Sequence, residues 1–177
     1  MKKLFFLAFM LVAAVAANAQ EGRFYLGGSL GFWSDSDADE TTITIAPELG
    51  YNLSDIWAVG ASLQFSRVDI GDNSVNIYGL EPYARFTYFE TGALRLFLDG
   101  QIGIASIKPK HGDSSTMFEL GIAPGLMFSL SDNFSLVGKL GFVGFRDVDK
   151  AYSSVMKNGW GIDLSGNNIE LGVIYSF

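Results

Sequence analysis

The sequence contains no cysteine, one histidine and only four prolines. Without cysteine the chain has no disulfide, no thiolate metal site and no lipoprotein anchor. One histidine leaves little room for imidazole chemistry. Only 18% of the 177 residues are charged, and the mean hydropathy is positive. These absences exclude a disulfide scaffold and thiol catalysis, while the length suffices for one domain with a core.

Acidic residues outnumber basic ones by 19 to 12, which gives a formal net charge of −7. Loss of an N-terminal leader carrying Lys2 and Lys3 leaves ten basic residues and a net charge of −9. An acidic chain repels the phosphate backbone, so we expect no nucleic-acid partner.

The first nineteen residues have the pattern of an export signal. Lys2 and Lys3 precede an unbroken apolar run over residues 4–17, and Ala17-Asn18-Ala19 is a small-x-small cleavage site. The run is shorter than the roughly 20 residues of a membrane-spanning helix. We therefore predict a cleaved secretory signal peptide over residues 1–19 and a single domain over residues 20–177. No later segment could span as a helix, which favours a barrel that crosses the membrane with strands.

Apolar residues occupy every second position in the clearest segments, residues 94–104 and 118–130. A period of two is typical of strands. Strands are predicted at about residues 23–33, 42–51, 56–66, 76–88, 94–107, 116–130 and 134–145, with a last strand ending at Phe177. The sequence therefore predicts an all-β fold, an eight-stranded antiparallel up-and-down transmembrane β-barrel.

The connections between these strands alternate in length. Residues 52–55, 89–93 and 131–133 are predicted tight turns, whereas residues 34–41, 67–75, 108–115 and 146–159 are longer and polar. Outer-membrane barrels have short periplasmic turns and longer extracellular loops. We therefore expect both termini on the periplasmic side and four loops outside the cell.

The composition of the two strand faces indicates which one meets lipid. A soluble lipocalin-like barrel directs its apolar face inward and its charges outward. Here the second face consists of glycine, alanine and serine with isolated charges of both signs, which suits a narrow, filled interior. Because unpaired interior charges are costly, we expect a buried, mixed-sign structural network. Strand parity assigns to it Glu48, Glu81, Arg85, Arg95, Asp99, Glu119, Lys139 and Glu170.

Aromatic residues gather near the strand ends, as interface girdles do. Near the short turns lie Tyr51, Trp57, Tyr88, Phe128, Phe134, Tyr175 and Phe177, and near the long loops lie Phe32, Trp33, Phe65, Phe118, Phe142 and Trp160.

Two features depart from a regular barrel. Pro47, Pro82 and Pro124 fall inside predicted strands, where a missing N–H removes a ladder bond, so we expect bulges at their level. In the last strand the apolar positions change from even to odd numbers, which predicts a bulge or bend near Gly166.

Two segments look like one hairpin used twice: APELGYNLSDIWAVG at residues 46–60 and APGLMFSLSDNFSLVG at residues 123–138. Both resemble the strand, turn and strand of the outer-membrane β-barrel family common in Bacteroidetes, which is similar in form to OmpA-type and OmpX-type barrels. The closing LGVIYSF, with Tyr175 and Phe177, resembles the family's C-terminal assembly signal. The resemblance covers the whole mature chain and implies recognition by the barrel assembly machinery. Nothing after the barrel in this sequence resembles a peptidoglycan-binding domain, so we expect no wall anchor of the OmpA type.

Two loop segments invite a chemical interpretation. Residues 35–40 hold four carboxylates that could bind calcium, but Glu40 stands where an EF-hand needs glycine, so we expect a solvated acidic loop. His111 lies near Asp113, Ser114 and Ser115, but the His-x-Ser of outer-membrane lipid deacylases is absent because Asp113 holds that position. We therefore expect no enzyme, no metal and no cofactor.

Together these observations predict a monomeric protein in the outer membrane of a Gram-negative bacterium, surrounded by outer-membrane lipid. Its role is structural, or rests on loops that bind an extracellular protein or glycan. A narrow pore or transport component is the alternative, followed by a soluble lipocalin-like secreted binder and, weakest, a surface hydrolase. Loop sequence alone does not identify a partner.

Overall fold

The computed structural model describes residues 23–35, 40–71, 73–110, 112–149, 158–164 and 169–177. These residues form ten strands: β1 (Phe24–Asp35), β2 (Glu40–Asn52), β3 (Trp57–Ile70), β4 (Asn73–Thr91), β5 (Leu94–Pro109), β6 (Ser115–Ser129), β7 (Phe134–Leu140), β8 (Phe142–Asp147), β9 (Gly159–Asp163) and β10 (Ile169–Ser176). In this part of the chain, no helix is long and apolar enough to cross a membrane.

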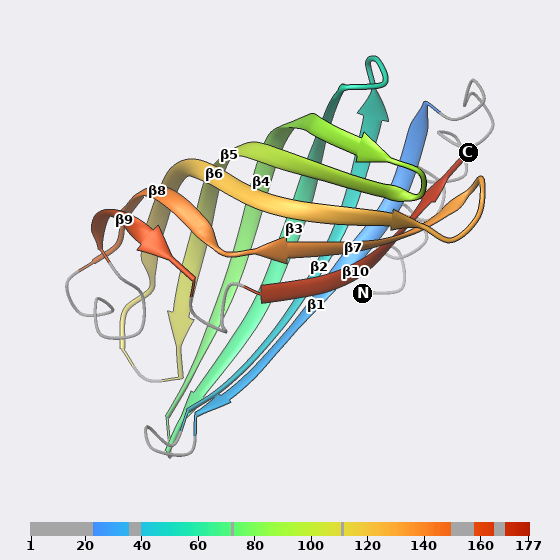
Figure 1. Cartoon of the computed structure of the whole chain (residues 1–177). Coiled ribbons are helices and arrows are strands. Elements are labelled where there is room, and N and C mark those ends of the chain that lie inside the picture. Colours follow the sequence, from blue (N-terminus) through green and yellow to red (C-terminus); the bar gives the residue numbers. More distant parts are fainter. Residues whose placement is uncertain (1–22, 36–39, 72, 111, 150–157, 165–168) are drawn as a thin grey trace, which may run out of the picture.

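The strands form one antiparallel barrel (Figure 1). Strands β1 to β6 each pair with the next in sequence, β7 and β8 together pair with β6, and β10 pairs with β7. Pairing of β1 with β10, as in Leu26↔Tyr175, closes the ring. Strands β7 and β8 together make the seventh barrel strand, and β9 and β10 together make the eighth. The ten segments therefore make eight barrel strands. The predicted eight-stranded antiparallel barrel is confirmed.

The seventh barrel strand is divided at Gly141, which has φ 81°. Strand β6 pairs as Gly125↔Lys139 with β7 but as Ile122↔Val143 with β8, so the seventh strand carries one extra residue between these pairs. This bulge changes which positions face inward, because Lys139 and Phe142 are both buried. Phe142 is therefore not in the outer aromatic girdle, where strand parity had placed it.

The prediction of bulges at Pro47 and Pro82 is wrong. Pairing of β2 with β3 lapses at Ala46 and Pro47 but resumes in the same register, and pairing of β4 with β5 does the same at Glu81 and Pro82. Each proline lacks an N–H to donate, so a ladder bond is lost without a slip. The register shift in β4 lies instead between Thr87 and Phe89.

The last barrel strand changes its outward positions as the apolar pattern indicated. Trp160 and Ile162 are exposed in β9, whereas Leu171 and Val173 are exposed in β10. The bend expected near Gly166 lies outside the described residues.

The connections differ from the expected four long loops. Strands β3 and β4 pair as far as Ile70↔Asn73, so most of the expected loop over residues 67–75 belongs to the strand ladder, and Gly71, at φ 52°, directly follows β3. The other outer connections cover residues 36–39, 110–114 and 148–158, and each is shorter than predicted. The connections at the opposite end cover residues 53–56, 92–93 and 130–133. The β-branched residues of the hairpin tips extend the ladders beyond the predicted strand ends.

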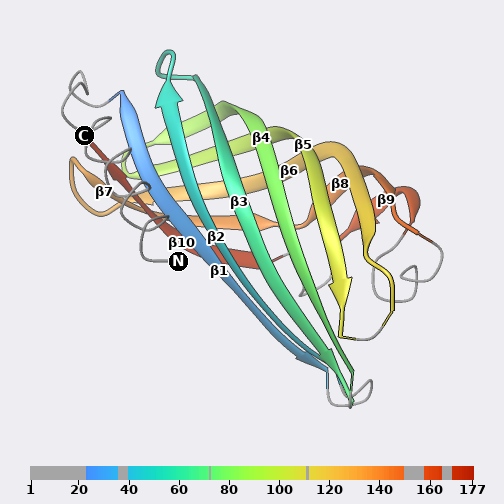
Figure 2. The ribbon, with the colours of Figure 1, turned by 180° about the vertical axis from the view of Figure 1, so that it is seen from behind.

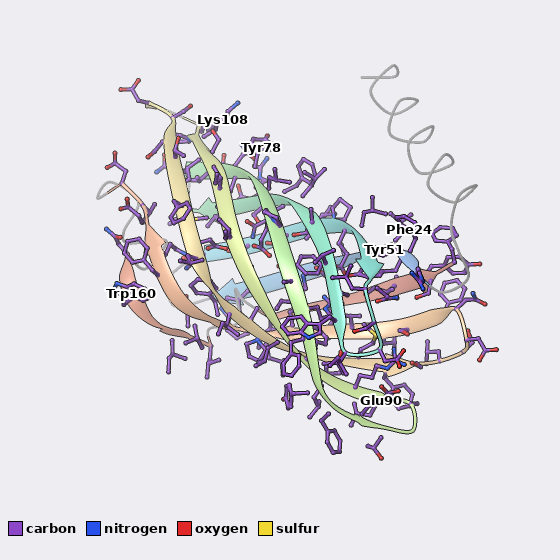
Figure 3. The ribbon with its side chains drawn as sticks, turned by 90° about the horizontal axis from the view of Figure 1, so that it is seen from above. Phe24, Tyr51, Tyr78, Glu90, Lys108 and Trp160 are labelled. Carbon is purple, nitrogen blue, oxygen red and sulfur yellow. The ribbon has the colours of Figure 1, made fainter. Side chains whose placement is uncertain are left out.

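The barrel exposes its apolar face and buries its polar one. Outward side chains on neighbouring strands include Ile43, Ile45, Leu63, Leu80, Ile104, Leu120, Ile122, Leu136, Leu171 and Val173, all more than a third exposed. The short-turn end of this belt carries aromatic pairs such as Phe24–Tyr51 and Phe134–Tyr175. Figure 3 shows Phe24 and Tyr51 at one end of the strands and Tyr78 and Lys108 at the other.

Apolar clusters bound the barrel interior at both ends. Near the short turns, Tyr25, Ala58, Phe97, Val137 and Ile174 form one cluster, which we call the inner cluster. Near the outer connections, Val68, Val75, Ile77, Ala105, Ile107, Met117 and Val148 form the outer cluster. Polar residues fill the space between them. The sequence had suggested an interior of small residues and charges alone, so these clusters are an addition to that prediction.

Candidate functional site

A balanced group of charges, the arginine cluster, lies beside the inner cluster. Arg85 donates from Nε and Nη2 to the two carboxylate oxygens of Asp99 at 2.7 and 2.8 Å. Arg85 and Lys139 also lie 3.7 and 3.6 Å from the Glu48 carboxylate. All four residues are less than a tenth exposed. Two cations thus face two carboxylates, the arrangement that buried ions require.

Two tyrosines and a phenylalanine complete the arginine cluster. Tyr83 donates its hydroxyl hydrogen to Glu48 at 2.9 Å, and its oxygen lies 2.9 Å from the hydroxyl of Tyr25. The guanidinium carbon of Arg85 lies 4.0 Å from the ring centre of Phe97. Sequence reasoning missed both tyrosines, although Tyr83 shares the parity of Glu81 and Arg85.

The second group, the glutamate cluster, lies farther along the interior. Glu119 accepts hydrogen bonds from Arg146 at 3.0 Å and from Gln101 at 3.5 Å. Arg146 also lies 3.6 Å from Asp163. The Glu81 carboxyl lies beside those of Glu119 and Glu170.

Sequence reasoning missed Arg146 and Asp163. Arg146 was placed in the loop over residues 146–159 because the predicted seventh strand ended at residue 145, whereas β8 continues to Asp147. A bulge at glycine before Phe142-Val143-Gly144-Phe145 is the signal that could have shown it.

Arg95 does not join either cluster, contrary to expectation. Its side chain is 42% exposed and pairs with Glu90 at 3.1 Å, which is 43% exposed. Arg95 lies near the start of β5, close to the turn at residues 92–93, so its inward parity directs it into the open mouth of the barrel. The other seven predicted residues lie in the interior, where Glu81 and Glu170 are partly exposed.

Within the described interior, carboxylates exceed cations. The acids are Glu48, Glu81, Asp99, Glu119, Asp163 and Glu170, and the cations are Arg85, Lys139 and Arg146. The arginine cluster is balanced, so the excess belongs to the glutamate cluster.

A cavity of about 350 Å³ opens at the short-turn end. Arg85, Phe97 and Tyr25 form its floor, and Arg95 lies on its wall. Asp55 and Asp132, from the turns at residues 53–56 and 130–133, lie at its rim. Five serines and Thr87 also line it, together with Asn52, Trp57, Ala58, Met127 and Ile174. The cavity ends at the inner cluster.

The candidate sites in the outer loops remain without chemical support. Residues 36–39 and His111 lie outside the described residues. Within the described ranges, no group of three His, Asp or Glu side chains is arranged to hold a metal ion.

At the outer end of β3, Arg67 donates hydrogen bonds to Asp69 at 2.9 to 3.0 Å, which lowers the pKa of the Asp69 carboxyl. Both side chains are well exposed, so the pair is a surface contact.

An outward apolar belt around a polar, filled interior defines the class of small membrane β-barrels. The family model for the outer membrane protein beta-barrel domain matches residues 4–177. The chain therefore belongs to this family of outer-membrane β-barrel proteins.

Solved structures agree on the fold. Neisserial surface protein A is 15% identical with a TM-score of 0.54, and covers 87% of this chain and 97% of its own. The N-terminal β-barrel domain of Pseudomonas aeruginosa OprF and the Yersinia pestis outer membrane protein Ail are each 18% identical with a TM-score of 0.54. Each of these covers 89% of this chain and 100% of its own. No curated protein sequence matches the chain.

Proposed function

We propose that this protein is a monomeric, integral barrel of the Gram-negative outer membrane whose role is structural or rests on contacts made by its outer hairpins. The observation that carries this proposal is the distribution of polarity, with an apolar belt outside and buried, ion-paired charges inside. Lipid covers such a belt and water does not. Because β1 and β10 close the ring, no second copy is needed to complete the barrel.

Heat-modifiability tests the closed membrane barrel. The mature protein refolded in detergent is expected to migrate as a compact band without boiling and to shift on boiling. Good solubility without detergent, together with the absence of a shift, would instead support a soluble lipocalin-like binder. We also propose cleavage after Ala19, which N-terminal sequencing of the exported protein would check.

The outer hairpins are the proposed contact surface for an extracellular protein or glycan. Figure 2 shows β1 to β4 continuing to a common tip beyond the rest of the barrel. Their outward residues there include Arg67, Asp69 and Asn76, which are polar. We propose no catalytic role. Ser29 donates a hydrogen bond to the Glu170 carboxylate, but Ser29 is buried in the barrel interior, where a substrate does not reach it.

The natural absence of cysteine makes the orientation testable. Ser114→Cys, in the connection at residues 110–114, is expected to react with a membrane-impermeant maleimide on intact cells. Ser131→Cys, in the turn at residues 130–133, is expected to react only after the outer membrane is permeabilised. The reverse pattern would invert the proposed orientation.

The interior supports a closed barrel over the alternative of a narrow pore. The inner and outer clusters bound the polar layer at both ends, and Phe97 and Ile107 are fully buried within them. Planar-bilayer recordings of pure protein should show no steady conductance. Steady single-channel steps would support transport.

We further propose that Tyr175 and Phe177 act as an assembly signal for the barrel assembly machinery. Their rings contact each other at 5.1 Å, and Tyr175 also contacts Phe134. Phe177→Ala should reduce the amount of assembled protein in cells several-fold while leaving refolding in detergent intact. Equal loss in both settings would indicate a purely structural role.

A further inference from the structure

The cavity at the short-turn end is a concave site that neither the barrel architecture nor the outer hairpins explain. Its volume of about 350 Å³ lies in the range of small-molecule sites, roughly 300–1,000 Å³. It is closed at the bottom by Arg85, Phe97 and Tyr25, so a molecule that enters cannot pass through.

The floor of the cavity holds an unused hydrogen-bond donor. The Nε and Nη2 atoms of Arg85 are occupied by Asp99, and Glu48 lies near Nη2. Arg85 lines the cavity, whereas its two carboxylate partners do not. Among the described residues, Nη1 of Arg85 is the one buried side-chain nitrogen or oxygen without a hydrogen-bond partner. Such a group is unfavourable unless a ligand or water meets it.

Charges of opposite sign are separated along the depth of the cavity. Arg85 lies at the floor and Arg95 on the wall, whereas the carboxylates of Asp55 and Asp132 lie on the exposed turns of the rim. A simple anion would meet the repulsion of the rim carboxylates, and a simple cation would meet hydrogen-bond donors, not acceptors, at Arg85 and Arg95. A molecule with a carboxylate at one end and an ammonium at the other satisfies both.

We propose that this cavity binds a small zwitterion, an amino acid or short peptide with free termini. Its carboxylate faces Arg85 and Arg95, and its ammonium faces the rim aspartates. The serine and threonine hydroxyls of the lining provide further hydrogen bonds. The periplasmic origin of the ligand rests on the orientation given under the proposed function. Binding itself does not depend on that orientation.

Methionine methyl groups give a direct readout. Met127 lines the cavity, whereas Met117 belongs to the outer cluster at the other end of the barrel. In detergent-refolded protein with labelled methionine methyls, glycylglycine should shift the Met127 signal saturably and leave the Met117 signal in place. N-acetyl-glycylglycine lacks the ammonium and glycylglycinamide lacks the carboxylate, so each should bind at least several-fold more weakly.

A matched pair of arginine variants tests the wall of the cavity. Arg95→Gln should weaken glycylglycine binding about tenfold, the effect of one charge-assisted hydrogen bond. Arg67→Gln removes an arginine at the opposite end that is likewise exposed and paired with a carboxylate, and it should leave binding unchanged. Both variants should keep the heat-induced gel shift, which reports the barrel separately from the cavity.

Three results would overturn the proposal. The first is no saturable Met127 shift with glycylglycine. The second is binding of either capped peptide as tight as that of glycylglycine, which would show that the site does not require both charges. The third is equal affinity of Arg95→Gln and Arg67→Gln protein. Each could occur in a protein that still shifts on boiling and spans the membrane.

Discussion

Arg85 has the greatest influence on the barrel interior of any single residue, because three neighbouring groups depend on its charge. It pairs with Asp99 and Glu48 and packs on the ring of Phe97. Removing one member of a buried ion pair leaves its partner charged in a low-dielectric environment. Removing one member of an exposed pair such as Arg95–Glu90 costs little stability, because water replaces the lost partner.

We predict that Arg85→Met destabilises the barrel by about 3–5 kcal/mol, because Asp99 loses both of its hydrogen bonds from arginine. Arg95→Met removes an arginine of the same parity from the mouth and should change stability by less than about 1 kcal/mol. Urea unfolding in detergent micelles measures both. Similar effects of the two substitutions would contradict the assignment of Arg85 to a buried cluster and Arg95 to the mouth.

The glutamates at positions 48 and 81 should respond in opposite directions to loss of charge. Glu81 lies beside Glu119 and Glu170, so at a pH at which Glu81 is ionised, Glu81→Gln relieves repulsion and should stabilise the barrel by about 1 kcal/mol. Glu48 pairs with Arg85 and Lys139 and accepts from Tyr83, so Glu48→Gln should destabilise it by about 2 kcal/mol. Urea unfolding of the two variants in detergent micelles tests both predictions. Destabilisation by Glu81→Gln would refute the excess of negative charge in the glutamate cluster.

Pairing of strands places glycines beneath the large interior rings. A Cβ atom at Gly50 would overlap the ring of Tyr25, and one at Gly125 would overlap the ring of Phe97. A Cβ atom at Gly60 would lie 2.6 Å from the Tyr83 ring. The inner cluster and its tyrosines therefore fit inside the barrel because neighbouring strands present no side chain there.

We predict that Gly50→Ala and Gly125→Ala each destabilise the barrel by about 1–3 kcal/mol, the usual effect of overpacking. Gly100→Ala is the matched control on the outward face of β5, where the nearest atom to a Cβ is the Ala84 carbonyl oxygen at 3.8 Å. It should be neutral or slightly stabilising. Unfolding midpoints for the three variants test this, and a neutral Gly50→Ala would show that the Tyr25 ring can move aside.

Alternation predicted the elements well where one face is apolar throughout. The residues of β5 and β6 were assigned to the correct faces, because a strand with one lipid-facing side repeats strictly every second residue. The same rule failed at Gly141, where one extra residue reverses the parity and carries Phe142 and Arg146 inward. It also failed at the outer hairpins, because the pairing of Arg67↔Asn76 continues after the apolar pattern stops.

The candidate site was predictable only in part. Parity identified Glu48, Arg85, Asp99 and Lys139 as inward-facing, but parity gives no position along the barrel axis. It therefore could not separate the buried Arg85 from Arg95 at the mouth. Nor could it show the cavity, which is formed by turns and strands that meet only in three dimensions.

At the scale of the whole molecule, polarity is inverted relative to a soluble barrel. The surface between the aromatic girdles is formed by leucine, isoleucine and valine, while interior charges are neutralised in pairs or grouped with partners. Two apolar clusters close the ends of the polar layer. This arrangement is stable when lipid surrounds the barrel, and it predicts aggregation of the folded protein in water without detergent.

The central claim, that the apolar face meets hydrocarbon, can be tested by one fluorescence measurement. Trp33, Trp57 and Trp160 are replaced by phenylalanine, and Leu120→Trp places a single tryptophan on the outward face of β6, where Leu120 is 45% exposed. In vesicles with brominated acyl chains, we predict strong quenching of this tryptophan and protection from aqueous iodide. Quenching by iodide without quenching by brominated lipid would contradict the membrane-embedded barrel.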